Sequence, residues 1–65
     1  MRLIVNGEFC ETAAASVEDL VREQGADPAR VAVVRNGELL PRGERAAAAL
    51  RDGDRIELLT FATGG

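Results

Sequence analysis

The fold is decided by the opening run Arg2-Leu3-Ile4-Val5-Asn6-Gly7-Glu8-Phe9-Cys10-Glu11-Thr12, which predicts two strands joined by a turn. The Asn-Gly pair is typical of the two-residue type I′ loop of a β-hairpin. With that pair as the loop, Leu3 lies opposite Cys10 and Ile4 lies opposite Phe9. Because side chains alternate across a strand, we expect the first pair on one face of the hairpin and the second pair on the other.

A helix is expected after the hairpin. Ser16 can cap the free amides of its first turn, and Gly25 is typical of a helix end. The apolar residues between them recur at the spacing of one helical face: Val17, Leu20 and Val21. This stripe predicts a short helix that packs on the sheet and carries no ligand pattern.

Three further strands are expected after the helix. Residues 31–35 form the first, residues 38–40 return after a second Asn-Gly turn, and residues 55–61 form the last. Residues 41–49 predict a loop that closes into a single helical turn. This order places the first and last strands in parallel at the centre of the sheet. We therefore expect an α+β β-grasp fold, a mixed sheet of four to five strands packed on one main helix.

Length and composition restrict the function. Sixty-five residues predict one domain, residues 1–65, which buries only about 60% of its unfolded surface and has no room for an enzyme cleft. The single cysteine and the absence of histidine predict no disulfide and no metal site. A net charge of −3 argues against nucleic-acid binding. Without a signal peptide or a membrane span, the expected location is the cytoplasm and the expected partner is another protein.

The sequence closes with Gly64-Gly65. A pair of residues without Cβ can enter a channel too narrow for any side chain, and Ala62 and Thr63 would add reach. We expect residues 61–65 to form a flexible tail of this kind. The alternative is an end that is flexible without serving any function, which is common in proteins.

A terminal carboxylate on Gly65 would be ionised at pH 7 but chemically unactivated. Its activation as an acyl adenylate requires Mg²⁺, cationic groups and a loop that holds the phosphates of ATP. The sequence has no phosphate-binding glycine motif and no lysine. We therefore expect this chain to bind no cofactor itself, to meet ATP and Mg²⁺ at a partner enzyme, and to serve as a co-substrate rather than as an enzyme.

One face of the sheet is expected to remain uncovered by the helix. Alternation along the strands places five apolar residues on it: Ile4, Phe9, Val34, Leu59 and Phe61. A gathered set of exposed apolar residues indicates a protein interface, with Arg35 and Arg55 as polar contacts at its rim. The alternative is a register shifted by one residue, which would exchange the two faces.

The whole chain resembles the small sulfur carrier proteins of thiamine biosynthesis, which have the ubiquitin-like β-grasp fold. The motifs that carry the resemblance are Asn6-Gly7, Ser16-Val17-Glu18-Asp19-Leu20, Val33-Val34-Arg35-Asn36-Gly37-Glu38-Leu39-Leu40-Pro41-Arg42, Asp52-Gly53-Asp54-Arg55-Ile56-Glu57 and the closing Gly-Gly. Their order and spacing are more specific than any one of them.

The resemblance implies that Gly65 carries sulfur. In that family the terminal glycine is adenylated by an adenylyltransferase related to the E1 enzymes of the ubiquitin pathway. Sulfur drawn from a cysteine desulfurase then converts it to a thiocarboxylate, which supplies the sulfur of the thiazole ring to thiazole synthase. The adenylyltransferase, the desulfurase and the synthase are thus the implied partners.

Three alternatives stay open from the sequence. The small subunit of molybdopterin synthase uses the same terminal chemistry for the molybdenum cofactor but is usually longer. A ubiquitin-like modifier would instead join its terminus to lysines of other proteins. A passive β-grasp binding module would carry its glycines without using them.

Overall fold

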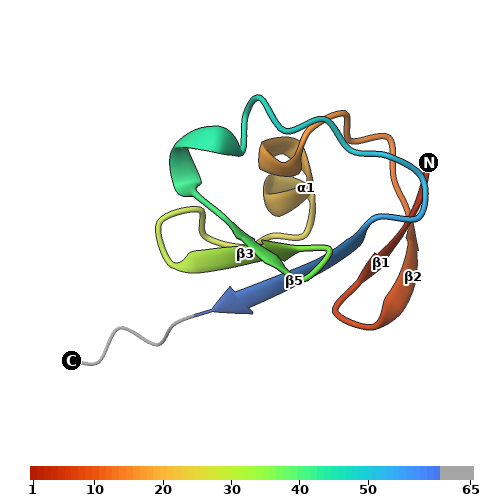
Figure 1. Cartoon of the computed structure of the whole chain (residues 1–65), viewed down its shortest axis with the longest axis horizontal. Helices are drawn as coiled ribbons and strands as arrows, with labels where there is room; N and C mark the ends of the chain where they lie inside the picture. The colour runs from red at the N-terminus through yellow and green to blue at the C-terminus, as the bar shows by residue number, and fades with distance from the viewer. Residues whose placement is uncertain (61–65) are drawn as a thin grey trace.

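The computed structural model describes residues 1–60 of the chain. Its elements are β1 (Arg2–Val5), β2 (Glu8–Glu11), α1 (Val17–Glu23), β3 (Val31–Arg35), β4 (Glu38–Leu40), the 3-10 helix η1 (Arg42–Glu44) and β5 (Arg55–Thr60). The strands form one sheet in the order β2-β1-β5-β3-β4, in which β1 and β5 are parallel and all other neighbours are antiparallel. Figure 1 shows α1 on one side of this sheet. The predicted β-grasp arrangement is confirmed.

The β1–β2 hairpin has the register predicted from its Asn-Gly loop. Leu3 pairs with Cys10, and Ile4 pairs with Phe9. Asn6 and Gly7 both have positive φ, 50° and 82°, as a type I′ turn requires. The second Asn-Gly pair, at the β3–β4 turn, has the same geometry.

The helix begins where the cap residue predicts. The hydroxyl of Ser16 accepts a hydrogen bond from the amide of Asp19 at 3.2 Å. Two other free amides of the first turn are satisfied from outside the helix, since Val17 N donates to Ala48 O and Glu18 N donates to Arg45 O. The long connection between β4 and β5 is thereby attached to the start of α1.

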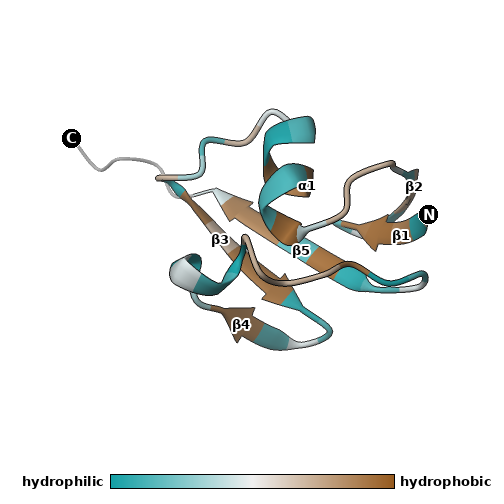
Figure 2. Cartoon of the chain, turned by 90° about the horizontal axis from the view of Figure 1, so that it is seen from above, coloured by the Kyte–Doolittle hydropathy of each residue, from teal (hydrophilic) through white to brown (hydrophobic). Residues whose placement is uncertain are grey.

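The core lies between α1 and the sheet face that α1 covers. Figure 2 shows the hydrophobic residues that run along β1, β3 and β5 beneath the helix. Leu50, in the connection before β5, is also buried there, so a segment far from the helix in the sequence completes the core. Among residues 1–60, the nine buried hydrophobic residues are Leu3, Val5, Val17, Leu20, Val21, Val31, Val33, Leu50 and Ile56.

Two predictions concern segments outside the regular elements. The predicted helical turn within residues 41–49 is present as η1. The predicted flexible tail, residues 61–65, lies outside the described residues. Among residues 1–60, no helix is long and apolar enough to cross a membrane.

Candidate functional site

The base of the tail is part of the central strand of the sheet. β5 lies between β1 and β3, and its last residue, Thr60, pairs with Val31 of β3. Thr60, the last described residue, is therefore anchored in the sheet. The residues predicted to carry sulfur or to give reach lie beyond the described part: Gly65, Gly64, Thr63 and Ala62.

Four of the five predicted interface residues lie on the sheet face opposite α1. Phe9 is 74% exposed and Leu59 is 46% exposed, whereas Ile4 and Val34 are half-buried. The fifth, Phe61, lies outside the described residues. Since the register is the predicted one, these side chains share a face. Their role as an interface stays a prediction.

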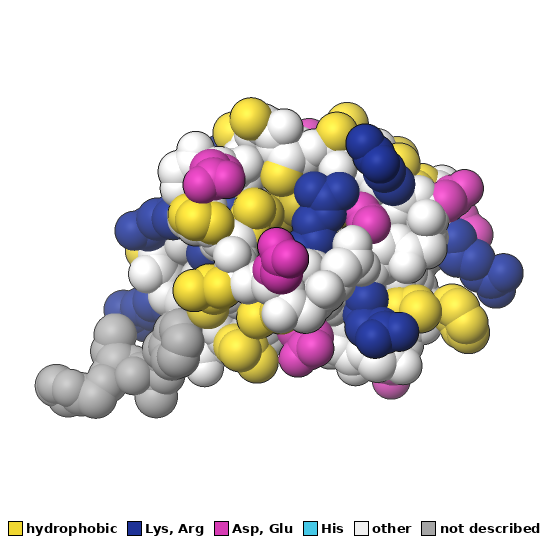
Figure 3. All heavy atoms as spheres, viewed as in Figure 1, with side chains coloured by type: hydrophobic (Ala, Val, Ile, Leu, Met, Phe, Trp, Pro, Cys, Tyr) yellow, Lys and Arg dark blue, Asp and Glu magenta, His cyan; other side chains and the backbone are white. Residues whose placement is uncertain are grey.

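The open face is divided into two patches by charged residues of β5. Ile4 pairs with Arg55, and Val34 pairs with Glu57, so both charges stand between β1 and β3. The hairpin patch consists of Ile4 and Phe9, and the guanidinium carbon of Arg2 lies 4.9 Å from the Phe9 ring centre. On the side of the molecule that Figure 3 shows, hydrophobic and charged side chains are likewise interspersed.

The tail-side patch lies on β3, β4 and β5, and its members are Ala32, Val34, Leu39 and Leu59. Leu39 is 69% exposed and was not predicted. It could have been found from the sequence. Ile4 and Phe9 are the second residues before and after the first Asn-Gly loop, and Val34 and Leu39 hold the same positions around the second loop. The apolar surface closest to the base of the tail is therefore larger than predicted.

The prediction that Arg35 lies at the rim of the open face is wrong. Val31 and Val33 point toward α1, so alternation along β3 sends Arg35 to the same side. Its Nη2 donates to Ala49 O at 2.8 Å and to Asp54 Oδ2 at 3.0 Å. Arg35 thus holds the connection before β5 in place, and of the two arginines predicted at the rim, Arg55 is the one on the open face.

Asp54 is the best-connected carboxylate in the described residues. Burial alone would raise its pKa, but hydrogen bonds from the Asn36 amide and the Arg51 backbone N–H, together with the charge of Arg35, outweigh that effect. The pKa of Asp54 consequently lies below its usual value.

Within residues 1–60, no three His, Cys, Asp or Glu side chains are grouped so that they could hold a metal ion.

The fold and this surface define a class: a small β-grasp protein whose central strand leads through an anchored base toward a Gly-Gly end. The sequence profile of the ThiS family matches residues 3–65. The chain belongs to the ThiS family.

Two solved structures resemble the whole chain. One is the crystal structure of the thiamine biosynthesis protein ThiS from Geobacter metallireducens, with 38% identity, full coverage of both chains and a TM-score of 0.83. The other is a solution structure of a thiamine biosynthesis protein from the same organism. It has 36% identity, covers 100% of this chain and 88% of the other, and gives a TM-score of 0.80.

A curated relative is much longer. It is a thiazole synthase of Paramagnetospirillum magneticum, 42% identical over 66 residues. The match covers 100% of this chain but only 20% of the relative. A segment similar to the whole of this chain is therefore part of that longer protein.

Proposed function

We propose that this chain is a sulfur carrier for thiazole formation in thiamine biosynthesis, with the sulfur held as a thiocarboxylate on Gly65. The observation that carries the proposal is the ThiS family match, which runs through Gly65. Two thiamine biosynthesis proteins with the same fold over the whole chain support it. The same match favours this pathway over molybdenum cofactor synthesis and over a protein modifier.

The chemistry begins at an ionised carboxylate. A carboxylate oxygen of Gly65 attacks the α-phosphate of ATP at an E1-like adenylyltransferase, and pyrophosphate leaves. The terminal sulfur of a persulfide on a donor such as a cysteine desulfurase then attacks the acyl carbon, and AMP leaves. A thiol, for which the added cysteine can serve, cleaves the resulting acyl disulfide; the thiocarboxylate is released and the thiol remains joined to the donor's cysteine as a disulfide. The carrier itself is a co-substrate, because ATP and Mg²⁺ are held by the adenylyltransferase. This chemistry would take place in the cytoplasm.

The folded body presents the tail to these enzymes. Leu59 directly precedes the last residue of β5, so a partner that encloses residues 61–65 must come close to the tail-side patch. Apolar side chains with a charged border are typical of protein interfaces. We propose this patch, and with it Val34 and Leu59, as the docking surface for the adenylyltransferase and the synthase.

Thiazole synthase is the proposed acceptor of the sulfur. The thiazole synthase of Paramagnetospirillum magneticum includes a segment that is 42% identical to this chain. A carrier and an enzyme that act on each other gain effective concentration when one polypeptide joins them. That relationship supports thiazole synthase as the partner of this chain.

Intact-mass measurement tests the proposal. The chain is incubated with the adenylyltransferase and the desulfurase of its own organism, ATP, Mg²⁺ and cysteine. We expect a mass increase of about 16 Da, the difference between sulfur and oxygen, with the new group on the final residue. A reaction without ATP is the control and should show no change. An unchanged mass in the complete reaction would contradict the sulfur-carrier function.

A further inference from the structure

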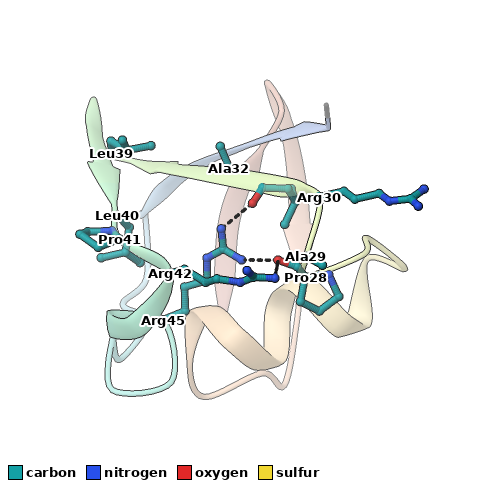
Figure 4. Close-up of a pocket in the computed structure, with 10 residues that line it drawn as sticks. Pro28, Ala29, Arg30, Ala32, Leu39, Leu40, Pro41, Arg42 and Arg45 are labelled. Carbon is teal, nitrogen blue, oxygen red and sulfur yellow. Dashed lines mark hydrogen bonds between the residues drawn. The ribbon is translucent and has the colours of Figure 1, made fainter. Parts of the chain in front are cut away.

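A pocket of about 270 Å³ lies beside the base of the tail, between the segment 28–32, the end of β4 and η1. This volume is below the roughly 300–1,000 Å³ typical of sites for small molecules. Figure 4 shows Leu40 and Pro41 on one side, Pro28 and Ala29 on the other, and two arginines at the base. The pocket is therefore of a size to receive one or two side chains.

Arg45 is buried at the base of this pocket, with only 3% of its surface exposed. Its guanidinium donates to the backbone oxygens of Pro28, at 3.1 Å, and Val31. The third guanidinium nitrogen position, Nε, is buried and has no hydrogen-bond partner. Both acceptors are neutral, so the buried positive charge is solvated only by dipoles.

Arg42 adds a second positive charge at the same place. Its Nη2 donates to the same Pro28 oxygen at 3.2 Å, so the two guanidinium groups are held close together. In the described part of the chain, no carboxylate forms an ion pair with either of them. Two like charges held together repel each other, and a nearby negative charge would relieve that repulsion.

The charge around the pocket differs from that of the chain as a whole. The chain has a net charge of −3, but the residues that line the pocket include three arginines and no acidic residue. The third, Arg30, already forms an ion pair with Asp27 at 3.6 Å, and its side chain points away in Figure 4. Arg42 is thus the exposed cation that is available to a partner.

We propose that this pocket binds an acidic, leucine-bearing segment of a protein partner. A carboxylate of that segment pairs with Arg42, and its aliphatic side chain lies against Leu40 and Pro41. The apolar walls distinguish this partner from a free anion, which would gain nothing from them. Nucleic acid is disfavoured because the chain is acidic overall.

The location gives the pocket a use in docking. Val31, which lines the pocket, pairs with Thr60, the last residue of β5. A partner segment seated there lies beside the base of the tail and adds a charged contact to the apolar one of the tail-side patch. Binding at this pocket involves the folded body and does not depend on sulfur chemistry at Gly65.

Titration with a defined peptide, acetyl-Gly-Glu-Leu-Asp-Gly-amide, tests the proposal by amide chemical shifts of the labelled chain. We expect saturable shifts confined to residues 28–32 and 39–45. Arg42→Gln should weaken the affinity about fivefold, as for a partly exposed ion pair. Arg22→Gln, a change of an exposed arginine on α1, is the matched control and should leave the affinity unchanged. Unchanged core amide shifts in both variants verify folding.

Two variant peptides and two simple anions separate the outcomes. A peptide with Gln and Asn in place of Glu and Asp should bind more weakly, and so should one with Ser in place of Leu. Sodium phosphate and sodium acetate should shift the same amides only at far higher concentration. Equal affinity for the free anions, equal affinity for the Ser peptide, or an absence of shifts at the pocket would overturn the proposal. The mass measurement on Gly65 is independent of all these results.

Discussion

Arg35 Nη2 lies 3.0 Å from Asp54 Oδ2, which joins the end of β3 to the residue that precedes β5. The same carboxylate accepts from Asn36 Nδ2 at 3.0 Å and from Arg51 N at 2.9 Å. Asp54 is buried, so these bonds are shielded from water. One side chain therefore sets the turn from which the central strand β5 is directed.

Asp54→Asn should lower the free energy of unfolding by about 1–3 kcal/mol at pH 7. The reason is that the three groups that donate hydrogen bonds to the Asp54 carboxylate lose their negatively charged acceptor. The pKa of Asp54 is lowered in the folded state, so its contribution is complete above the unfolded value of about 3.9 and is lost as the pH falls through the folded pKa. Urea unfolding of both proteins from pH 7 to pH 2 measures the difference. A difference that stays constant down to pH 2 would contradict this role.

Asn6 completes the hydrogen bonding of β5 where β1 ends. Its Oδ1 accepts from Leu58 N at 2.8 Å. Asn6→Gly keeps a residue that tolerates positive φ but removes this acceptor. We expect a loss of about 1 kcal/mol in unfolding free energy and faster hydrogen exchange at the Leu58 amide.

Asn6→Asp is the control for this change, because aspartate retains an acceptor oxygen and also tolerates a turn. Its Leu58 amide should exchange at nearly the wild-type rate. Equal protection of Leu58 in the Gly variant would show that the side chain of Asn6 does not support β5.

The strand order, the hairpin register and the inward faces could be predicted from the sequence. They depend on local signals, the Asn-Gly loop and the two-residue alternation, which the structure follows. Ser16 could be predicted as a cap for the same reason. Leu39 was within reach of the same arithmetic and was missed because β4 is only three residues long.

The partners of Arg35 and Arg45 could not be predicted in the same way. Arg35 follows the alternation of β3, but the carboxylate and carbonyl that make an inward arginine tolerable come from residues 49–54. Arg45 is buried by contacts with Pro28 and Val31. Long-range partners of this kind have no periodic signal in the sequence, so the arginine pocket beside the tail was not predicted.

Leu59→Glu should weaken binding to the proposed partners, the adenylyltransferase and thiazole synthase, by about tenfold or more. Its free energy of unfolding should stay within about 0.5 kcal/mol of the wild-type value. The reason is position, because Leu59 is exposed in the tail-side patch next to the last residue of β5. Isothermal titration with each enzyme measures the effect.

Phe9→Glu is the matched control for Leu59→Glu, since it places the same charge on the same face in the hairpin patch. Ile4, its neighbour, pairs with Arg55 at the start of β5, about 16 Å along the strand from Thr60. We expect a smaller loss of binding than for Leu59→Glu. If Phe9→Glu has the larger effect, the partner covers the hairpin patch and the docking surface proposed here is misplaced.

Deletion of Gly65 should abolish sulfur transfer and leave the folded body intact. The nine buried hydrophobic residues in the described part of the chain lie between Leu3 and Ile56, so the deletion removes none of them. The unfolding free energy should therefore shift by less than about 0.5 kcal/mol. The terminal carboxylate, however, then follows Thr60 by one residue fewer. It can no longer reach the reacting position in an active site that accommodates the full-length terminus. The readout is growth without thiamine of a strain in which the deletion variant replaces the wild-type chain, with urea unfolding of the purified variant as the check on folding. Growth at the wild-type rate from a stably folded deletion variant would mean that the terminal glycine is not the sulfur-bearing residue.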